Sequence, residues 1–423
     1  MNFLQMRRIL CKLEFILLTK LQFKEYSIKD FFIVLSVILI SKSLYYESYG
    51  TNILLIGFLS FLMLNTNFKY LKINKMILLY IFGIITLLLI NIDTNYSSFL
   101  VLINRVLIAI LVIYLITFER FSKAFIDIII VLSVISWFSW LVILLDIPSF
   151  LPNFTGIDGR PIRNFIFFGV WEEFINYKTF RNSGLWWEPG AFQVFVNLAF
   201  IFSLINKVVT IKKYFVFLIT IISITSTTGF LVFLMLSLIY FKKFLNLNKK
   251  NLLYLGLFLI LSLVSFVYLI PLIYDKFNSD SNSFVSFLSR YYDVLISINM
   301  FVDNIFIGYG FGSQIEKAIP YGENLIGYDL YYLATPTGAD GITMFISQVG
   351  ILGFILIIPF LFPKYISHLS VLDKIVISIS LFLIFNTENF TFLLIFIVLT
   401  FYGLIKNKIS LQKEKYETPN NSQ

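Results

Sequence analysis

Hydrophobic runs of about 14 to 22 residues recur along almost the whole chain, and short polar connections separate them. Such runs are typical of helices that cross a membrane, because hydrocarbon offers no water to satisfy backbone amides and carbonyls. The strands of a membrane β-barrel would be shorter and would alternate in polarity. We therefore predict an all-α integral membrane protein of about 12 transmembrane helices, at residues 31–46, 53–65, 76–92, 99–118, 124–145, 189–206, 213–225, 228–241, 252–270, 341–362, 371–386 and 390–405.

The charged residues orient this prediction. Most of the 33 Lys and Arg fall in alternate connections, whereas most of the 24 Asp and Glu fall in the others. Because cytoplasmic connections carry an excess of Lys and Arg, we place both termini in the cytoplasm. Residues 1–405 then form a single polytopic membrane domain, which begins with a basic amphipathic segment at 1–29, and residues 406–423 form a cytoplasmic tail.

Composition excludes several classes of protein. Of all residues, 58% are hydrophobic and only 13% are charged, against about 25% charged in a soluble domain. Cys11 and His368 are the single members of their types, so neither an intrachain disulfide nor a Cys/His metal centre can form. The net charge of +9 is not gathered in a soluble basic patch, so we expect no nucleic-acid partner.

Two connections are long, 146–187 and 271–340, and both are predicted on the outer side. Long polar loops between hydrophobic helices are often functional. The second loop contains an amphipathic helix from Ser289 to about Ile305, which we expect flat on the outer leaflet or against the bundle. Gly308-Tyr-Gly-Phe-Gly312 then makes a flexible turn, without the Lys-Ser/Thr of a phosphate-binding P-loop.

The densest group of chemically capable residues is Arg181-Asn-Ser-Gly-Leu-Trp-Trp-Glu-Pro-Gly190, where the first outer loop meets a hydrophobic helix. Pro189 suits the first position of a helix, whose positive N-terminal end attracts anions. With Arg181 beside it, this end suits a phosphate or diphosphate. In the plainer alternative, Glu188 caps the helix and pairs with Arg181. Trp186 and Trp187 are candidates for stacking on sugar rings, or are headgroup-level belt residues.

Three further arginines are candidates for binding an anionic substrate. Arg290 begins the amphipathic helix of the second loop, and its planar guanidinium can donate two parallel hydrogen bonds to phosphate. Arg105 lies within the outer half of the fourth predicted helix, where an Arg faces either a cavity or the interface. Arg163 lies in the first outer loop, where plain solvation is the alternative. Thr225-Ser-Thr-Thr-Gly229 is a polar break that either lines a cavity or only turns the chain.

These motifs resemble those of bacterial O-antigen and capsular polysaccharide polymerases, of the O-antigen polymerase/ligase superfamily. The similar segments, in their order along the chain, are Arg181 to Phe192, Ser223-Ile-Thr-Ser-Thr-Thr-Gly229, Ser289-Arg290 with Asn304-Ile-Phe-Ile-Gly-Tyr-Gly310, and Asp340-Gly-Ile with Gln348-Val-Gly-Ile-Leu-Gly353. The resemblance covers about 175 to 360 by motif and the whole chain by topology.

The resemblance implies a membrane-embedded glycosyltransferase of the C type at the outer face of the bacterial cytoplasmic membrane. It implies glycans linked to undecaprenyl diphosphate as substrates, no cofactor or metal, and possible work beside a flippase and a chain-length regulator. Arg181, Arg290 and Arg105 would neutralise the diphosphate leaving group, and Glu188 would orient Arg181 or act as a base.

Two departures from the family bear on its alternatives. Ligases of the superfamily are expected to use an outer-side His, and we place His368 on the inner side, which favours polymerase over ligase. The paired Arg-x15-Gly motifs of some polymerases are absent, since Asn197 and Phe306 stand where the glycines would be. A flippase or transporter for lipid-linked sugars would need cations deep in several helices. A purely structural membrane protein would not need two long outer loops.

Overall fold

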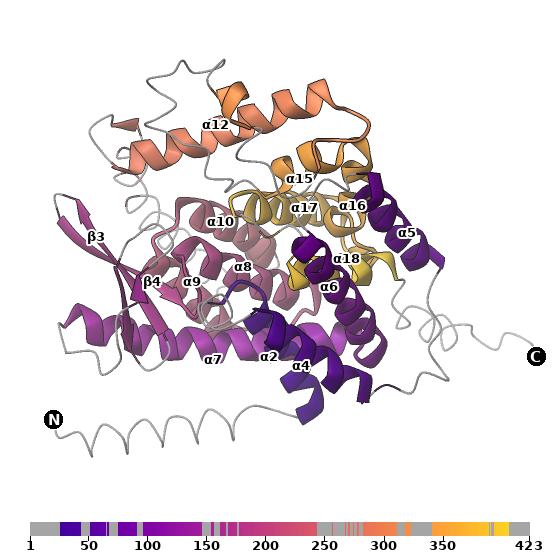
Figure 1. Cartoon of the computed structure of the whole chain (residues 1–423). Coiled ribbons are helices and arrows are strands. Elements are labelled where there is room, and N and C mark those ends of the chain that lie inside the picture. Colours follow the sequence, from indigo (N-terminus) through magenta and orange to yellow (C-terminus); the bar gives the residue numbers. More distant parts are fainter. Residues whose placement is uncertain are drawn as a thin grey trace, which may run out of the picture.

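The fold is described from a computed structural model of the chain (Figure 1). The structure describes residues 26–43, 51–64, 66, 75–90, 96–145, 154–155, 161–165, 168–175, 177–242, 256, 267, 270, 274, 277–278, 282–310, 318–322, 341–388, 390 and 393–405. The predicted helix at 252–270, the basic segment at 1–29 and the tail at 406–423 lie wholly or mostly outside these residues.

Helices make up most of the described chain. The first half contains α2 (Ile28–Ile40), α4 (Thr51–Leu64), α5 (Lys75–Ile90), α6 (Tyr96–Leu115) and α7 (Phe118–Leu144). The second half contains α8 (Pro189–Ile205), α9 (Ile211–Ile224), α10 (Thr227–Lys242), α12 (Asn282–Asp303), α15 (Ile342–Val349), α16 (Ile351–Leu361), α17 (Val371–Asn386) and α18 (Leu394–Leu404), with a 3-10 turn at Lys364–Ile366.

Every predicted hydrophobic helix other than 252–270 has a helical counterpart within a few residues. Among the described residues, α7 alone is both long and apolar enough to cross a bilayer by itself, and the apolar stretches of the other helices have 10–17 residues. This architecture is compatible with a helical membrane protein. The twelve crossings themselves stay a prediction.

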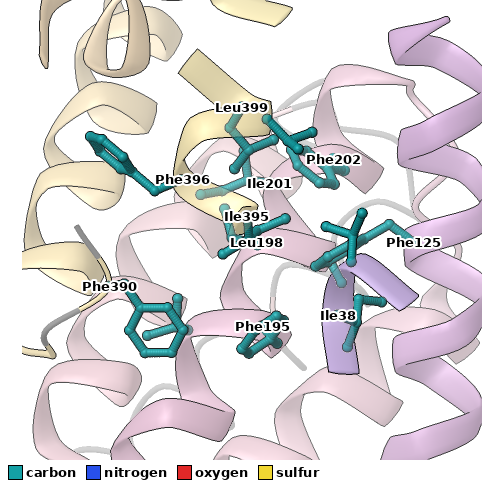
Figure 2. Packing of buried hydrophobic residues seen from close by; sticks show 14 of the residues in the cluster. Ile38, Phe125, Phe195, Leu198, Ile201, Phe202, Phe390, Ile395, Phe396 and Leu399 are labelled. Atoms are coloured by element: carbon teal, nitrogen blue, oxygen red, sulfur yellow. The ribbon is translucent and has the colours of Figure 1, made fainter. Parts of the chain in front are cut away.

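Helix α8 lies at the centre of the described packing. Its sequence is apolar around almost its whole circumference, which is typical of a helix with neighbours on every side. It packs against α7, α9, α10 and α17. Figure 2 shows Phe195, Leu198 and Ile201 of α8 among residues of α2, α7 and α18. The chemically capable segment before Pro189 therefore leads directly into the core.

The segment 154–184 corrects the expectation of helices alone. Four antiparallel strands form a meander in the order β1 (Phe154–Thr155), β2 (Pro161–Phe165), β3 (Phe168–Ile175) and β4 (Tyr177–Gly184). Figure 1 shows β3 and β4 as a ribbon beside the end of α7. Trp140 of α7 donates from Nε1 to the Phe180 carbonyl at 2.9 Å, which fastens the ribbon to the bundle. Aromatic and β-branched residues in this segment favour strands.

The predicted helix at 341–362 is two helices. Gly350 separates α15 from α16 with a φ of 67°, a left-handed conformation that favours glycine. A Cβ at this position would also lie 2.7 Å from the Ile305 carbonyl oxygen and the Phe306 carbonyl carbon. The break receives the turn after α12, where the Ile351 amide donates to the Ile305 carbonyl at 2.6 Å.

The turn at Gly308 and Gly310 is held against this break, and so it is not free as we expected. Both glycines have positive φ, of 72° and 86°. The Tyr309 amide donates to the Ser347 carbonyl and the Gly310 amide to the Gln348 carbonyl, each at 3.0 Å. The last member of the predicted glycine turn, Gly312, lies outside the described residues.

Helix α12 is amphipathic as predicted, and the face that it buries is mixed. Asp293 and Ser297 are buried together with Ile296 and Met300, whereas Ile298 and Val302 are about half exposed. Its described packing is against α15. Of the two expected placements, exposed apolar residues are compatible with the outer leaflet and contradict an apolar side turned to the bundle. Lipid accepts apolar side chains, whereas polar groups need partners within the protein.

Replacing Gly350 with Ala tests the break. The added Cβ would meet Ile305 and Phe306 backbone in a strained conformation, so we expect a loss of about 1–3 kcal/mol in thermal unfolding of the purified protein. Gly57→Ala is the matched control, since nothing lies within 4 Å of its Cβ position in α4. That change should stabilise the protein by about 0.5–1 kcal/mol. Equal effects of the two substitutions would contradict the broken helix.

Candidate functional site

The N-terminal end of α8 lies against the side chain of Glu388, in the turn between α17 and α18. A Cβ on Gly190 would overlap the Glu388 carboxylate, so glycine at this position makes room for it. Glu388 is 2% exposed. A carboxylate removed from water in this way needs charged or hydrogen-bonding partners.

Two cations supply part of that requirement. Lys42 Nζ lies 3.5 Å from Glu388 Oε2, and Arg290 Nη2 lies 3.5 Å from Glu388 Oε1. The carboxylate is almost fully buried, whereas the side chains of Lys42 and Arg290 are 17% and 38% exposed. The two cations therefore lie between the buried carboxylate and the surface.

Glu188 is the fourth charged member of the group. It occupies the residue before α8 with extended backbone, yet its side chain makes no capping hydrogen bond to the helix. Its side chain instead lies beside that of Glu388, and the two can share a hydrogen bond when one of them carries a proton. The plainer alternative, a Glu188 that caps α8 and pairs with Arg181, is therefore wrong in its side-chain cap. We define Lys42, Glu188, Arg290 and Glu388 as the α8 charge cluster.

Burial raises the pKa of Glu388 to about 7, and the negative charge of Glu188 and its hydrogen bond to Glu388 add to the increase. Lys42 and Arg290 act in the opposite direction. When two carboxyl groups are in contact, the negative charge of one disfavours ionisation of the other, so the pair keeps one proton to a higher pH than an isolated carboxyl group does. Glu388 therefore changes its charge near neutral pH, which ordinary carboxyl groups do not.

Lys42 reaches the cluster because the residues after α2 are tied to two other elements. Lys42 directly follows Ser41, the C-cap of α2, and has a φ of 65°. Before it, Ser41 accepts the Ile395 amide hydrogen at Oγ and the Trp186 indole hydrogen at its carbonyl, at 3.0 and 3.2 Å. After it, Ser43 forms a single antiparallel bridge with Trp186. This short stretch thus joins α2 to the start of α18 and to the residues before α8.

A second glycine positions Glu388 from the opposite side. The Gly341 amide donates to the Asn386 carbonyl at 3.1 Å, and a Cβ on Gly341 would lie 2.6 Å from the Glu388 carbonyl oxygen. Asn386 Oδ1 accepts from the Thr343 amide at 3.0 Å in the first turn of α15. Gly341 and Thr343 therefore fix the turn that carries Glu388. Asp340 of the predicted motif lies outside the described residues.

Arg181 lies in β4 and is anchored on the α9–α10 turn. Its Nε donates to Thr225 Oγ1 at 2.9 Å, and Thr225 ends α9 in a left-handed conformation. Gly229, in the first turn of α10, fits against Gln193 of α8. The polar break at 225–229 thus serves as a turn that binds Arg181 on one side and packs against α8 through Gly229 on the other. Arg181 is not among the charges that act on Glu388.

The other candidate residues have separate positions. Trp186 is fully buried, stacks on Phe195 with a centroid distance of 4.4 Å, and so presents no open face to a sugar or to lipid headgroups. Trp187 is 9% exposed. Arg105 is half-buried on α6 and is not among the charges that the structure places around Glu388. Arg163 lies in β2, and its side chain is outside the described part of the chain.

No family model, no curated protein and no solved structure matches this chain. The meaning of the α8 charge cluster therefore depends on its own geometry.

Sequence reasoning missed Lys42 and Glu388. Glu388 is an isolated acidic residue in a short outer connection, and Lys42 falls within a predicted helix. Nothing in their spacing links them to Arg290 or Glu188, which are about 100 to 250 residues away along the chain. One sequence signal was present, since Gly190 directly after Pro189 marks a close approach to the start of a helix.

The raised pKa of Glu388 predicts how stability changes with pH. The folded protein binds the proton on Glu388 more tightly than the unfolded chain does. The contribution of this proton to the free energy of unfolding is therefore full below about pH 4.5 and is lost as pH rises through about 7. We expect a loss on the order of 2–3 kcal/mol in thermal unfolding in detergent across this range. Glu388→Gln should flatten that decline.

Glu119→Gln is the control for this measurement. Glu119 pairs with Lys123 four residues later on α7 at 2.8 Å and is 40% exposed. The control should therefore keep the wild-type pH dependence. If the Glu388→Gln protein declines in parallel with the wild type, Glu388 does not titrate near pH 7.

Proposed function

We propose that the chain is a membrane glycosyltransferase that polymerises oligosaccharide repeat units linked to undecaprenyl diphosphate into a surface polysaccharide. The observation that carries this proposal is the α8 charge cluster, which gathers two cations and two carboxyl groups at the positive end of a buried helix. A diphosphate leaving group needs the cations, and an attacking hydroxyl needs a proton acceptor.

We place the donor's diphosphate at Arg290 and Lys42, and we expect Arg181, held on the α9–α10 turn, to contribute its charge from β4. Arg290 is the most exposed of the cluster's cations, and its guanidinium can bond two phosphate oxygens at once. The N-terminal end of α8 adds its positive partial charge. Together these groups stabilise the negative charge that builds on the diphosphate as it leaves.

The acceptor's hydroxyl is placed at Glu188. Its oxygen attacks the anomeric carbon of the donor, the bond from that carbon to the phosphate oxygen breaks, and its electron pair stays on the lipid diphosphate. The hydroxyl proton passes to Glu188. The buried Glu388 holds Glu188 through their hydrogen bond, so Glu188 has a fixed position for this transfer.

The setting proposed for this reaction is the outer face of the bacterial cytoplasmic membrane, with about 12 crossings and both termini inside. The exposed apolar residues of α12 and its buried polar residues support a helix between lipid and a polar site. A flippase supplies the donor in this scheme, and a chain-length regulator limits the product.

The position of His368 favours polymerase over ligase. His368 Nε2 lies 3.3 Å from the Ile205 carbonyl, at the last residue of α8. Helix α8 has 17 residues, which is about 25 Å. The single His of the chain is therefore at the opposite end of α8 from Glu188, where it cannot share a substrate with the cluster.

Loss of either arginine should abolish polymer while the protein still inserts. A strain that lacks this chain would carry wild type, Arg181→Ala, Arg290→Ala or Arg290→Lys, and its surface polysaccharide would be resolved on a gel. We expect single repeat units without a ladder for both alanine variants, because the leaving group loses its neutralising charge. Arg290→Lys should keep a weak ladder, because Lys retains the charge without the paired hydrogen bonds.

Lys212→Ala is the control, because Lys212 is an exposed cation at the start of α9, in the predicted inner connection. It should give a normal ladder. A normal ladder that stays on the lipid carrier in the deletion strain would point to ligation, and units confined to the cytoplasmic face would point to transport. Either result would contradict the polymerase.

A further inference from the structure

The cations proposed to bind the donor are already bound by a group of the protein. Lys42 contacts one carboxylate oxygen of Glu388 and Arg290 contacts the other, each at 3.5 Å. The same carboxylate lies against Gly190 at the start of α8. Glu388 thus has three partners of the sort that bind a phosphate group, namely two cations and the N-terminus of a helix.

We propose that Glu388 occupies the anion site of the donor diphosphate in the free protein, and that the donor binds as Glu388 takes up one proton and releases Lys42 and Arg290. This inference rests on the proposed function and adds to it Lys42 as a donor-binding residue and a proton that accompanies binding. The proton comes from solvent and stays on a Glu388 oxygen.

The charge balance of the cluster requires such a proton. Two cations and two ionised carboxylates sum to zero, and a diphosphate diester brings two negative charges. With both carboxylates ionised, the occupied site would carry a net charge of minus two next to a nearly fully buried carboxylate, which is costly. Protonation of Glu388 halves that excess charge. It also allows Glu388 to donate a hydrogen bond to Glu188, so that Glu188 remains the ionised member of the pair.

The proton affinity of Glu388 is suited to this coupling. The pKa of Glu388 is raised to about 7 in the free protein, so protonation costs little near neutral pH. A bound diphosphate raises it further, because it adds negative charge and draws Lys42 and Arg290 away. Linkage is reciprocal, so protonation of Glu388 strengthens donor binding by the same factor. Glu188, Lys42 and Arg290 are the charged groups that act on Glu388 from α8, from the end of α2 and from α12.

The test measures binding of a short donor to the purified full-length protein in detergent. The probe is farnesyl-diphospho-N-acetylglucosamine, a diphosphate diester whose own charge stays constant between about pH 6 and about pH 9. Calorimetry in two buffers of different ionisation enthalpy counts the protons taken up. Above about pH 7 we expect the dissociation constant of the wild type to rise about tenfold per pH unit, with close to one proton taken up per probe.

Three variants make the test specific. Glu388→Gln imitates the protonated form, so its affinity should not depend on pH, and near pH 8.5 it should bind at least about tenfold more tightly than the wild type. Glu188→Gln removes the negative charge that helps to raise the pKa of Glu388. The affinity of this variant for the probe should therefore begin to fall at a lower pH than that of the wild type. Glu119→Gln, the same chemical change on α7, should behave like the wild type.

The outcomes separate this inference from the proposed function. If the probe binds but its affinity has the same pH dependence in wild type and Glu388→Gln, or if no proton is taken up, the inference is wrong and the donor site stands. If neither protein binds the probe at any pH while both unfold cooperatively, the donor site fails, and the proposed function fails with it.

Discussion

Buried charge at the start of α8 is the constraint on which the described architecture depends. Glu388 is removed from water, so its charge has to be balanced by groups that come from far along the chain. Lys42 follows α2, Arg290 lies on α12, and Glu188 precedes α8. These contacts require α2, α8, α12 and the α17–α18 turn to meet at one end of the bundle, and the apolar core beneath them holds that meeting in place.

Glycines allow the close approach that this arrangement needs. Gly190 admits the Glu388 side chain, and Gly341 admits the backbone of the same turn. Gly350 receives the turn after α12, the helix whose first half carries Arg290. Gly190 and Gly341 are therefore packing residues that bring the turn carrying Glu388 against the starts of α8 and α15. A side chain at either of them would move a charge rather than only crowd a core.

The cluster also links acid–base behaviour to anion binding. Glu388 has a raised pKa because it is buried beside another carboxyl group, and it balances the same cations that would bind a diphosphate. In the function proposed above, Glu388 compensates these cations before the donor binds. An internal carboxylate does this without closing the site, since a proton can remove its charge.

The sequence determined the helical, apolar character of this protein and the positions of nearly all its hydrophobic helices. It also offered Glu188 and Arg290 as candidates, beside five others that the described part of the structure does not bring to Glu388. Those features follow from runs of apolar residues and from motifs, both of which lie within short stretches of the chain. Only the tertiary structure decided the partners. It turned Asp293 and Ser297 of α12 inward, formed strands at 154–184, buried Trp186 in the core, and brought Lys42 and Glu388 to the site. The reason is physical: which charges compensate a buried carboxylate depends on distances between residues far apart in sequence.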